Sequence, residues 1–363
     1  MPGHFSSNYH VSVYFTKARG KVSADLNMEL GFIMQFGMFG SAQAQRGGPN
    51  VDSGAGFREF VDRNVEAESL GYHSTFLVEH HFTGFGQVSA TLNLLTWIGA
   101  RTTTLRLGTA VIVLPWHNPI LLAEQIATLD LLSSGRFDAG IGKGYRLNEF
   151  EGFAMPTDEA DARFEECLEV MLKAWTLDSP WSHKGQYWQY DSVIVEPSSI
   201  QKPHPQLWMG AGSPRSIKQV AKLGFNMLLG QFDSFETIAE EVALFKSEVE
   251  SLGRIFDPMS VAVARSVNIV DSSEEYDQAI DNRVLARRRT QELAQQSSFQ
   301  DTREAAEAGV IYGASEYVSD QIQALQTIGV EYVLLNCPAG ISTLRMFAKD
   351  VMPEFQGNAR PFQ

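Results

Sequence analysis

The chain has 363 residues, of which 44% are hydrophobic and 20% charged, a balance typical of a globular protein with a buried core and not of a disordered one. Its formal net charge is −14 and its Lys and Arg residues are not clustered, which excludes a surface for nucleic acid. The densest basic run, Arg287-Arg288-Arg289, is interpreted as a solvated helix face.

From Met28 onward, short apolar runs alternate with longer amphipathic segments, the pattern of parallel strands joined by crossover helices. Eight strands are predicted, at Leu30–Phe36, Ser74–Val78, Arg106–Val113, Arg136–Ile141, Gln206–Ala211, Asn226–Leu229, Val261–Val270 and Tyr332–Asn336. Eight strands with helices between them predict a (β/α)8 TIM barrel, an α/β fold, in a single domain over residues 28–357. Residues 1–27 are interpreted as a peripheral or poorly ordered extension, and 358–363 as a tail.

Helices are predicted at Gly56–Leu70, Ala90–Arg101, Pro119–Leu132, Ala160–Trp175, Pro214–Leu223, Phe235–Leu252, 276–296 and Glu316–Ile328. Two of them begin with a cap residue followed by a first-turn proline, Asn118-Pro119 and Ser213-Pro214. Two segments are interpreted as insertions at the C-terminal face of the strands. The aromatic-rich segment Thr176–Pro203 is expected over the barrel mouth, and the polar segment Gln291–Ser315 is expected to be a mobile lid.

The sequence carries no signal for a membrane, a disulfide framework or a metal site. No apolar run approaches the roughly 20 residues that cross a bilayer, and residues 1–27 lack the apolar centre of a signal peptide. Cys167 and Cys337 lie far apart and match no spacing of metal ligands. We therefore expect a cytoplasmic protein that binds neither metal nor membrane.

Candidate catalytic residues are sought directly after each strand, because the active site of a (β/α)8 barrel lies at the C-terminal ends of its strands. The second strand is followed by Glu79-His80-His81-Phe82, which places titratable groups where one with a pKa near 7 can move a proton. Neighbouring residues on an extended strand end point to opposite sides, so the two histidines could hardly share one metal ion. A catalytic or ligand-contacting role is favoured over a zinc site and over buried structural histidines.

Two further segments are candidates for phosphate contact. Residues 140–145 (Gly-Ile-Gly-Lys-Gly-Tyr) are glycine-rich but fit neither the Walker pattern nor GxGxxG, and close packing at a strand end explains them about as well. The fifth strand leads through Ala211-Gly212-Ser213-Pro214-Arg215-Ser216 into a helix, presenting N–H groups and two hydroxyls at a positive helix end. This is a credible monophosphate cradle, although an isolated helix cap would have the same sequence.

Two blocks of the sequence resemble the bacterial luciferase-like flavin-dependent monooxygenases, with the best match to the luciferase α subunit. The blocks are residues 76–86, which contain Glu79-His80-His81, and residues 108–115. Similarity continues through Asp130, 134–137, 140–144, Arg163, 207–216 and 351–353, and so spans about residues 28–355. The resemblance implies a TIM barrel that binds FMN at its mouth.

The resemblance also implies roles for individual residues. His80 takes the place of the family's catalytic histidine, with Glu79 and His81 as supports that orient it or shape its pocket. Ala110-Val111 matches the position of a non-prolyl cis peptide beneath the flavin ring, so a cis bond is predicted here. The residues expected to contact the cofactor, mostly around its phosphate, are Gly142, Lys143, Arg163, Ala211, Gly212, Ser213 and Ser216. At Gly142 the luciferase α subunit has a reactive cysteine, so neither light emission nor a long-chain aldehyde substrate is implied.

The implied activity is that of a two-component monooxygenase, in which a separate NAD(P)H:flavin reductase supplies FMNH2. The reduced flavin reacts with O2 to give a C4a-(hydro)peroxyflavin, which oxygenates a small organic substrate by Baeyer–Villiger or aldehyde oxidation or by ring hydroxylation. The alternatives are an F420-dependent reductase or dehydrogenase, a non-catalytic flavin-binding partner subunit and a metal-dependent barrel hydrolase. Family members commonly pair through helices beside the first strands, here Phe57–Leu70 and Thr91–Arg101, so a homodimer is expected.

Apolar and aromatic side chains near the expected mouth are candidates for a substrate pocket that excludes water. They are Phe36, Met38, Phe39, Phe82, Phe85, Trp116, Tyr145 and Trp181. Each of them fits an ordinary hydrophobic core equally well.

Overall fold

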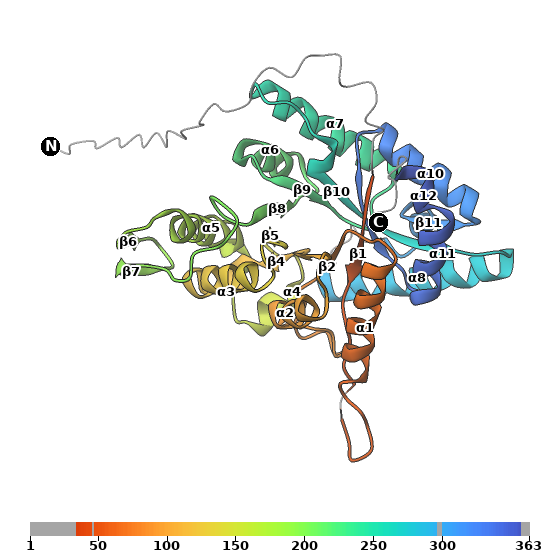
Figure 1. Cartoon of the computed structure of the whole chain (residues 1–363), viewed down its shortest axis with the longest axis horizontal. Helices are drawn as coiled ribbons and strands as arrows, with labels where there is room; N and C mark the ends of the chain where they lie inside the picture. The colour runs from red at the N-terminus through yellow and green to blue at the C-terminus, as the bar shows by residue number, and fades with distance from the viewer. Residues whose placement is uncertain (1–33, 46, 296–299, 357–363) are drawn as a thin grey trace.

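The computed structural model describes residues 34–45, 47–295 and 300–356, and its central feature is a closed barrel of parallel strands surrounded by helices (Figure 1). The barrel strands are β1 (Gln35–Gly40), β2 (Ser74–Leu77), β3 (Arg106–Thr109), β5 (Phe137–Gly142), β8 (Gln206–Gly210), β9 (Asn226–Leu229), β10 (Val261–Ile269) and β12 (Tyr332–Asn336). They pair in chain order, and β12 pairs with β1 to close the sheet. The predicted TIM barrel is confirmed.

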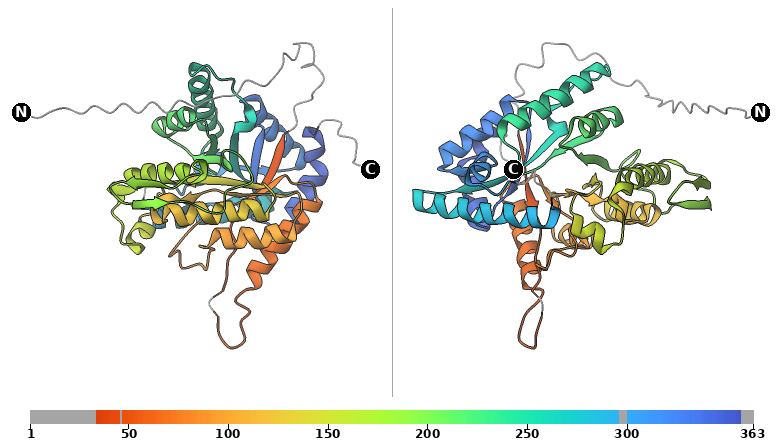
Figure 2. Two further views of the ribbon diagram at one scale, coloured as in Figure 1. Left: turned by 60° about the vertical axis from the view of Figure 1, so that its left-hand side comes forward. Right: turned by 180° about the vertical axis from the view of Figure 1, so that it is seen from behind.

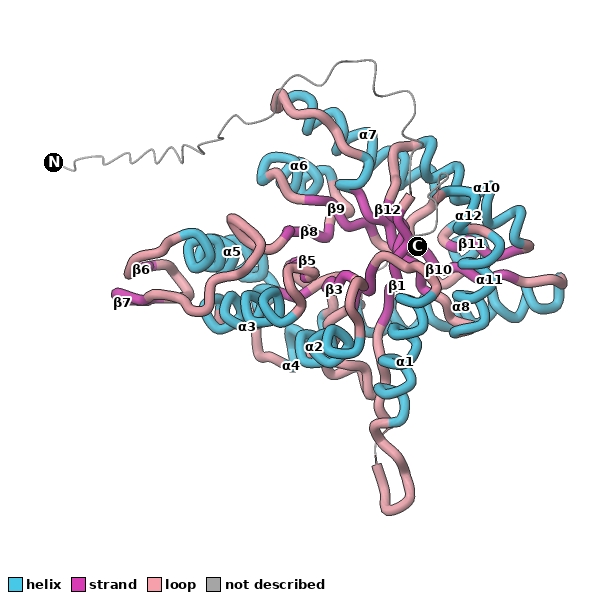
Figure 3. Tube along the Cα trace, in the orientation of Figure 1, coloured by secondary structure: helices cyan, strands magenta, loops and turns pink. Residues whose placement is uncertain are grey.

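Eight longer helices follow the predicted pattern and surround the strands (Figure 3). They are α1 (Ala55–Ser69), α2 (Thr91–Arg101), α3 (Pro119–Leu132), α5 (Ala160–Thr176), α6 (Pro214–Leu223), α7 (Phe235–Ser251), α8 (Ser273–Ala294) and α10 (Ser315–Thr327). Both predicted caps are present, since Asn118 accepts a hydrogen bond from the Leu121 N–H and Ser213 from the Ser216 N–H. Among the described residues, no helix is long and apolar enough to span a membrane.

Several short elements were not predicted. They are β4 (Ile112–Val113), β11 (Val310–Gly313), α4 (Leu147–Gly152), α9 (Arg303–Ala308), α11 (Ile341–Asp350), α12 (Met352–Phe355) and the 3-10 turns η2 (Leu114–Trp116), η3 (Thr157–Glu159) and η4 (Pro258–Ser260). The polar segment interpreted as a lid contains α9 and β11, and β11 pairs in parallel with the C-terminal half of β10. Its described residues are therefore largely helix and strand.

The first strand begins later than predicted, at Gln35, and continues to Gly40. The predicted strand ended at Phe36, whereas the observed strand includes Gly37. In the barrel Gly37 permits close packing, since a Cβ there would lie 2.1 Å from the Ser74 hydroxyl. Residues 30–33, the extension 1–27 and the tail 358–363 lie outside the described residues.

The insertion at 176–203 forms an antiparallel hairpin of β6 (Trp181–Lys184) and β7 (Gln189–Val193). It packs on the outer side of α5 and not over the mouth (Figures 1 and 2). The Glu166 carboxylate of α5 accepts hydrogen bonds from the N–H groups of Gln186, Tyr187 and Trp188, which fixes the hairpin turn. The hairpin therefore covers the helix α5.

The barrel is filled with side chains. Phe76, Trp208 and Tyr332 come from three different strands, and their rings meet edge to face with centroids 5.5–6.0 Å apart. A second and larger apolar cluster lies between the strands and the helices. Because the interior is a packed core, a ligand can bind only at the mouth formed by the C-terminal ends of the strands.

The basic run on α8 is not a solvated face throughout. Arg287 is only 4% exposed, and its guanidinium donates to the backbone carbonyls of Phe232 and Gln300. Arg288 and Arg289 are exposed, and Arg289 lies over the ring of Phe85 in the loop that follows β2. The interpretation is therefore wrong for Arg287, because unpaired loop carbonyls attract a buried donor that the sequence alone does not reveal.

Candidate active site

His80 lies at the mouth and is held by a carboxylate that the sequence analysis missed. Its Nδ1 is 3.0 Å from Oε1 of Glu149, and the same oxygen accepts a hydrogen bond from the His81 N–H at 2.9 Å. Glu149 belongs to the short helix α4 and is 1% exposed. A carboxylate only accepts hydrogen bonds, so Nδ1 carries the proton and Nε2 keeps its lone pair. No described residue forms a hydrogen bond with Nε2.

The charge state of His80 follows from its burial. Desolvation lowers the pKa of His80 below its ordinary value of 6.5, and the hydrogen bond to Glu149 opposes that shift only in part. His80 is therefore neutral at pH 7. Its Nε2 can accept a proton, and the hydrogen bond at Nδ1 fixes the orientation of the ring.

Glu79 is a structural carboxylate that joins three segments of the mouth. Its Oε1 is 3.0 Å from Nε2 of His81 and 2.8 Å from Nε2 of His117, and its Oε2 accepts from the Val113 N–H at 2.8 Å. Burial alone would raise the pKa of Glu79, but the hydrogen bonds from His117 and His81 hold it at about 2. Glu79 thus remains ionised and ties the end of β2 to β4 and to the turn after η2.

His81 points away from His80, as alternation along the strand end requires. Its ring packs against the rings of Phe82, Trp116 and Phe153, with centroids 5.9, 5.4 and 4.8 Å away. Within the part of the chain that the structure describes, no group of three or more His, Cys, Asp or Glu side chains is arranged to hold a metal ion. In this structure Glu79 and His81 hold the mouth together, while His80 has an unengaged ring nitrogen.

The predicted cis peptide bond between Ala110 and Val111 is present. It lies between β3 and β4, and glycines of two neighbouring strands lie against it. A Cβ at Gly142 would lie 2.5 Å from Cγ2 of Val111, and one at Gly210 would lie 3.4 Å from Cγ1. The departure from luciferase at Gly142 thus has a steric reason, because the Val111 side chain occupies the space that a cysteine Cβ would need.

Two cations meet at the start of α6. Lys143 Nζ is 2.8 Å from Oδ1 of Asp161, and Arg215 Nη1 is 3.4 Å from Oδ2 of the same carboxylate. All three side chains are well exposed, and Arg215 belongs to the first turn of α6. Ser213 and Ser216 form a reciprocal capping box, and the Ser216 hydroxyl accepts from the N–H groups of Gly212 and Ser213. The structure therefore brings Lys143 to the capped helix start, and the sequence analysis missed Arg215 and Asp161.

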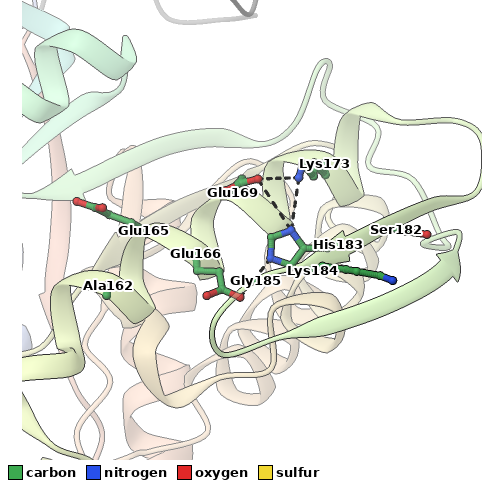
Figure 4. Close-up of a pocket in the computed structure, with 9 residues that line it drawn as sticks. All are labelled: Ala162, Glu165, Glu166, Glu169, Lys173, Ser182, His183, Lys184 and Gly185. Carbon is green, nitrogen blue, oxygen red and sulfur yellow. Dashed lines mark hydrogen bonds and ion pairs between the residues drawn. The ribbon is translucent and has the colours of Figure 1, made fainter. Parts of the chain in front are cut away.

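Arg163 is engaged elsewhere. It pairs with Glu159 at 2.8 Å, and its guanidinium lies 4.2 Å from the centre of the Tyr187 ring in the hairpin turn. A small pocket beside this turn contains His183, whose Nε2 is 3.2 Å from Glu166 and whose Nδ1 is 3.4 Å from Lys173 Nζ (Figure 4). These contacts fasten the hairpin to α5 and so hold Tyr187 against Arg163.

The candidate pocket residues divide between the mouth and the core. Phe82, Phe85 and Tyr145 are exposed at or beside the mouth, and Trp116 packs between Phe150 and Phe153. Phe39 packs against the cluster inside the barrel, together with Ala110 and Val111. In contrast, Phe36, Met38 and Trp181 lie in the outer core, where Phe36 contacts Phe347 and Phe355. The expectation that these three line the pocket is corrected, because Phe36 and Met38 occupy positions of β1 that face the outer core and Trp181 belongs to the hairpin strand β6, outside the barrel.

Residues 34–332 match the luciferase-like monooxygenase family. The chain belongs to this family. An uncharacterised protein, y4vJ of Sinorhizobium fredii, is 31% identical over 72% of the chain and 74% of its own length. The oxygenase component of a flavin-dependent trigonelline monooxygenase from Acinetobacter baylyi is 24% identical over 82% of the chain and 90% of its own length. The chain is therefore related to flavin-dependent monooxygenases and is an oxidoreductase.

Several solved structures share the fold. Monooxygenase RslO1 from Streptomyces bottropensis superimposes with a TM-score of 0.77 at 24% identity, covering 89% of this chain and all of its own. The oxygenating constituent of 3,6-diketocamphane monooxygenase from Pseudomonas putida, in complex with FMN, gives 0.72 at 19% identity over 89% and 99%. An F420-dependent secondary alcohol dehydrogenase gives 0.73 at 16% identity over the same shares. At these identities the superpositions establish the barrel fold.

Proposed function

We propose that this chain is the FMNH2-dependent oxygenase of a two-component monooxygenase. A separate NAD(P)H:flavin reductase in the cytoplasm supplies the reduced flavin, and the substrate is a small organic molecule oxygenated by Baeyer–Villiger or aldehyde oxidation or by ring hydroxylation. One observation carries the proposal: the Nε2 of His80, held by Glu149, is unengaged at the same mouth as the glycine-flanked Ala110-Val111 bond. The related oxygenase component from Acinetobacter baylyi supports the two-component arrangement.

The residues present fit FMN on two counts. Gly142 and Gly210 have no Cβ beside Val111, which allows a flat ring to approach the backbone there. Lys143 and Arg215 both contact the Asp161 carboxylate, next to the N-terminus of α6. Two cations beside a helix N-terminus form a site that suits an anion such as a phosphate. We assign the phosphate to Lys143, Arg215, Ser213, Ser216 and the Gly212 backbone. Arg163 would join them only after leaving Glu159 and Tyr187.

Reduced FMN, when bound, supplies the electrons that activate O2. His80 Nε2 accepts a proton from the reacting group and returns it, since His80 is neutral and its lone pair faces no protein donor among the described residues. Glu149 fixes the tautomer and the plane of the ring. The aromatic side chains Phe82, Trp116 and Tyr145 limit the access of water to the reacting groups.

The test is to titrate the purified chain with FMNH2 and with reduced F420 in parallel and to measure oxygen consumption. We expect tight binding of FMNH2 and oxygen uptake that falls about 10²- to 10⁴-fold in His80→Ala, the usual contribution of a proton-transferring side chain. Tight F420 binding without oxygen uptake would assign the chain to the F420-dependent branch. FMNH2 binding without oxygen uptake would make it a non-catalytic partner subunit, and unimpaired turnover in His80→Ala would overturn the role assigned to His80.

A homodimer through α1 and α2 is also proposed. Trp97 on α2 is 61% exposed, which is unusual for an indole unless a partner covers it. Light scattering is expected to give twice the chain mass, and Trp97→Glu is expected to give the monomer.

A further inference from the structure

Three buried arginines hold the loop that follows β9. Arg283 Nη2 donates to the carbonyl of Gln231 at 2.7 Å, Arg287 Nη1 to that of Phe232 at 3.1 Å, and Arg265 Nη1 to that of Asp233 at 2.6 Å. The Phe232 ring lies 4.7 Å from the Arg283 guanidinium and 5.3 Å from that of Arg287. Three successive carbonyls are thus fixed, and the loop at this side of the mouth is rigid.

The Gln231 side chain is fixed as well. Its Oε1 accepts from Arg283 Nη1 at 3.0 Å and from Nδ2 of Asn336, the last residue of β12, at 2.9 Å. With Oε1 occupied by two donors, the amide cannot flip, and its NH2 group must point away from them. Gln231 and Asn336 are both partly exposed, and each follows or ends a barrel strand at the mouth. The mouth therefore presents an oriented donor on the wall built by β9 and β12.

The charge behind this donor has no counter-ion. Arg283 is 5% exposed, and its guanidinium donates to the side chain and the carbonyl of Gln231 and forms no ion pair with a carboxylate of the described residues. Its Nε is buried without a hydrogen-bond partner. Burial lowers the pKa of Arg283 to about 10, while the nearby Tyr312 phenol opposes this shift and the Arg287 cation adds to it. Asp233 acts on Arg265 and Arg287, and Glu241 acts on Arg265. A buried cation without a paired anion is costly, so this side of the mouth is short of one negative charge.

We propose that Gln231, Asn336 and Arg283 form a subsite for an anionic group of the substrate, and that this substrate is an organic acid. The Gln231 NH2 group donates to the anion, and the positive charge of Arg283 stands directly behind the amide in a region of low dielectric constant. The anion supplies the negative charge that the subsite lacks. That the bound acid is oxygenated rests on the proposed function, whereas its binding does not.

The first experiment compares binding of benzoate and of benzamide, its neutral isostere, to the full chain by calorimetry without flavin. Benzoate is expected to bind at least tenfold more tightly. Gln231→Glu keeps an acceptor oxygen for the hydrogen bonds from Arg283 and Asn336, and it adds a negative charge beside Arg283. It is expected to weaken benzoate binding at least tenfold, without lowering the melting temperature or the affinity for FMN.

Three controls separate this subsite from the rest of the molecule. Arg283→Met, a second variant that removes the cation, is expected to bind benzoate no better than benzamide. Arg288→Gln, five residues further along α8 and exposed, is expected to leave benzoate binding unchanged. Lys143→Gln is expected to lose FMN affinity and to keep benzoate binding.

The two proposals can fail separately. Equal binding of benzoate and benzamide, or undiminished benzoate binding in folded Gln231→Glu, overturns the anion subsite, even if the chain consumes oxygen with FMNH2. If the chain prefers benzoate to benzamide, if this preference depends on Gln231, and if the chain does not bind FMN, the subsite is supported and the proposed function is overturned.

Discussion

Glu149→Gln isolates the charge behind His80, because glutamine keeps the shape of the side chain and an acceptor oxygen for both His80 Nδ1 and the His81 N–H. What is lost is the negative charge on a group that is 1% exposed. Hydrogen bonds to a charged group contribute about 1 kcal/mol more than neutral ones, and two are weakened. Arg146, buried with Nη1 4.0 Å from Glu149, also loses its nearest carboxylate. We expect the free energy of unfolding to fall by about 2–4 kcal/mol.

The same substitution must also change the titration of His80. Glu149 raises the pKa of His80 against the larger lowering effect of burial, so its removal moves the pKa further below 6.5. The neutral form of His80 then persists to lower pH, and the acid limb of the FMNH2-dependent oxygen uptake moves in the same direction. The plateau is expected to fall about 10²-fold or more, because a less basic and less firmly oriented imidazole transfers a proton more slowly.

The measurements are urea unfolding, the pH profile of oxygen uptake, and ¹⁵N NMR of the histidine rings with His80 assigned through His80→Ala. Glu151→Gln is the matched control, since Glu151 lies on the same short helix and is exposed. If Glu149 only held the loop in place, stability would fall while the His80 titration and the acid limb stayed where they were. That result would refute the reasoning.

Three further predictions concern the rest of the mouth. Gly142→Ala places a Cβ 2.5 Å from Val111 and is expected to cost about 1–3 kcal/mol of stability and to weaken FMN binding in calorimetry. In the control Gly48→Ala, the new Cβ meets open space, so stability and FMN binding are expected to stay unchanged. Asp161→Asn removes a carboxylate that competes for Lys143 and Arg215, so fluorescence titration should find FMN bound about two- to fivefold more tightly and riboflavin unchanged; equal tightening of both would contradict this. The pKa of Glu79 is lowered to about 2 in the folded chain, so its contribution to stability is complete above pH 4.5 and is lost as the pH falls through 2. Denaturant unfolding should therefore show a smaller loss of stability between pH 4.5 and 2.5 for Glu79→Gln than for the parent chain.

The periodicity of the sequence was sufficient for the barrel, because each crossover helix and each buried strand carries its own apolar pattern. All eight predicted helices and the eight predicted strands have counterparts in the structure. The pattern failed where packing and not hydrophobicity decides the conformation. A side chain at Gly37 would meet the Ser74 hydroxyl, and β11 is an apolar run of only four residues, Val-Ile-Tyr-Gly, in an otherwise polar stretch, where it pairs with β10.

In the candidate site too, some residues can be predicted from the sequence and others only from the folded structure. His80 follows a buried strand and can be found from that position, and the cis bond at Ala110-Val111 could be predicted from family resemblance. Glu149 lies 69 residues from its partner on a six-residue helix, and nothing in its local sequence indicates which histidine it contacts. Arg287 is interpreted as a surface charge until the loop carbonyl of Phe232 is in place. Partners of this kind exist only in the folded chain.

The placement of Asp161 bears on how a flavin could be exchanged. In a two-component system, reduced flavin must enter from a reductase and oxidised flavin must leave on each turnover, so very tight phosphate binding would be a disadvantage. Lys143 and Arg215 already bind the Asp161 carboxylate. The binding free energy of a phosphate is therefore only the difference between its own contacts with these cations and the carboxylate contacts that it replaces. Asp161 also lies in the first turn of α5, where a negative charge stabilises the helix, so this carboxylate is stabilised at its position without the two cations as well. An internal anion in the cradle thus limits affinity without removing the cations that select for a phosphate.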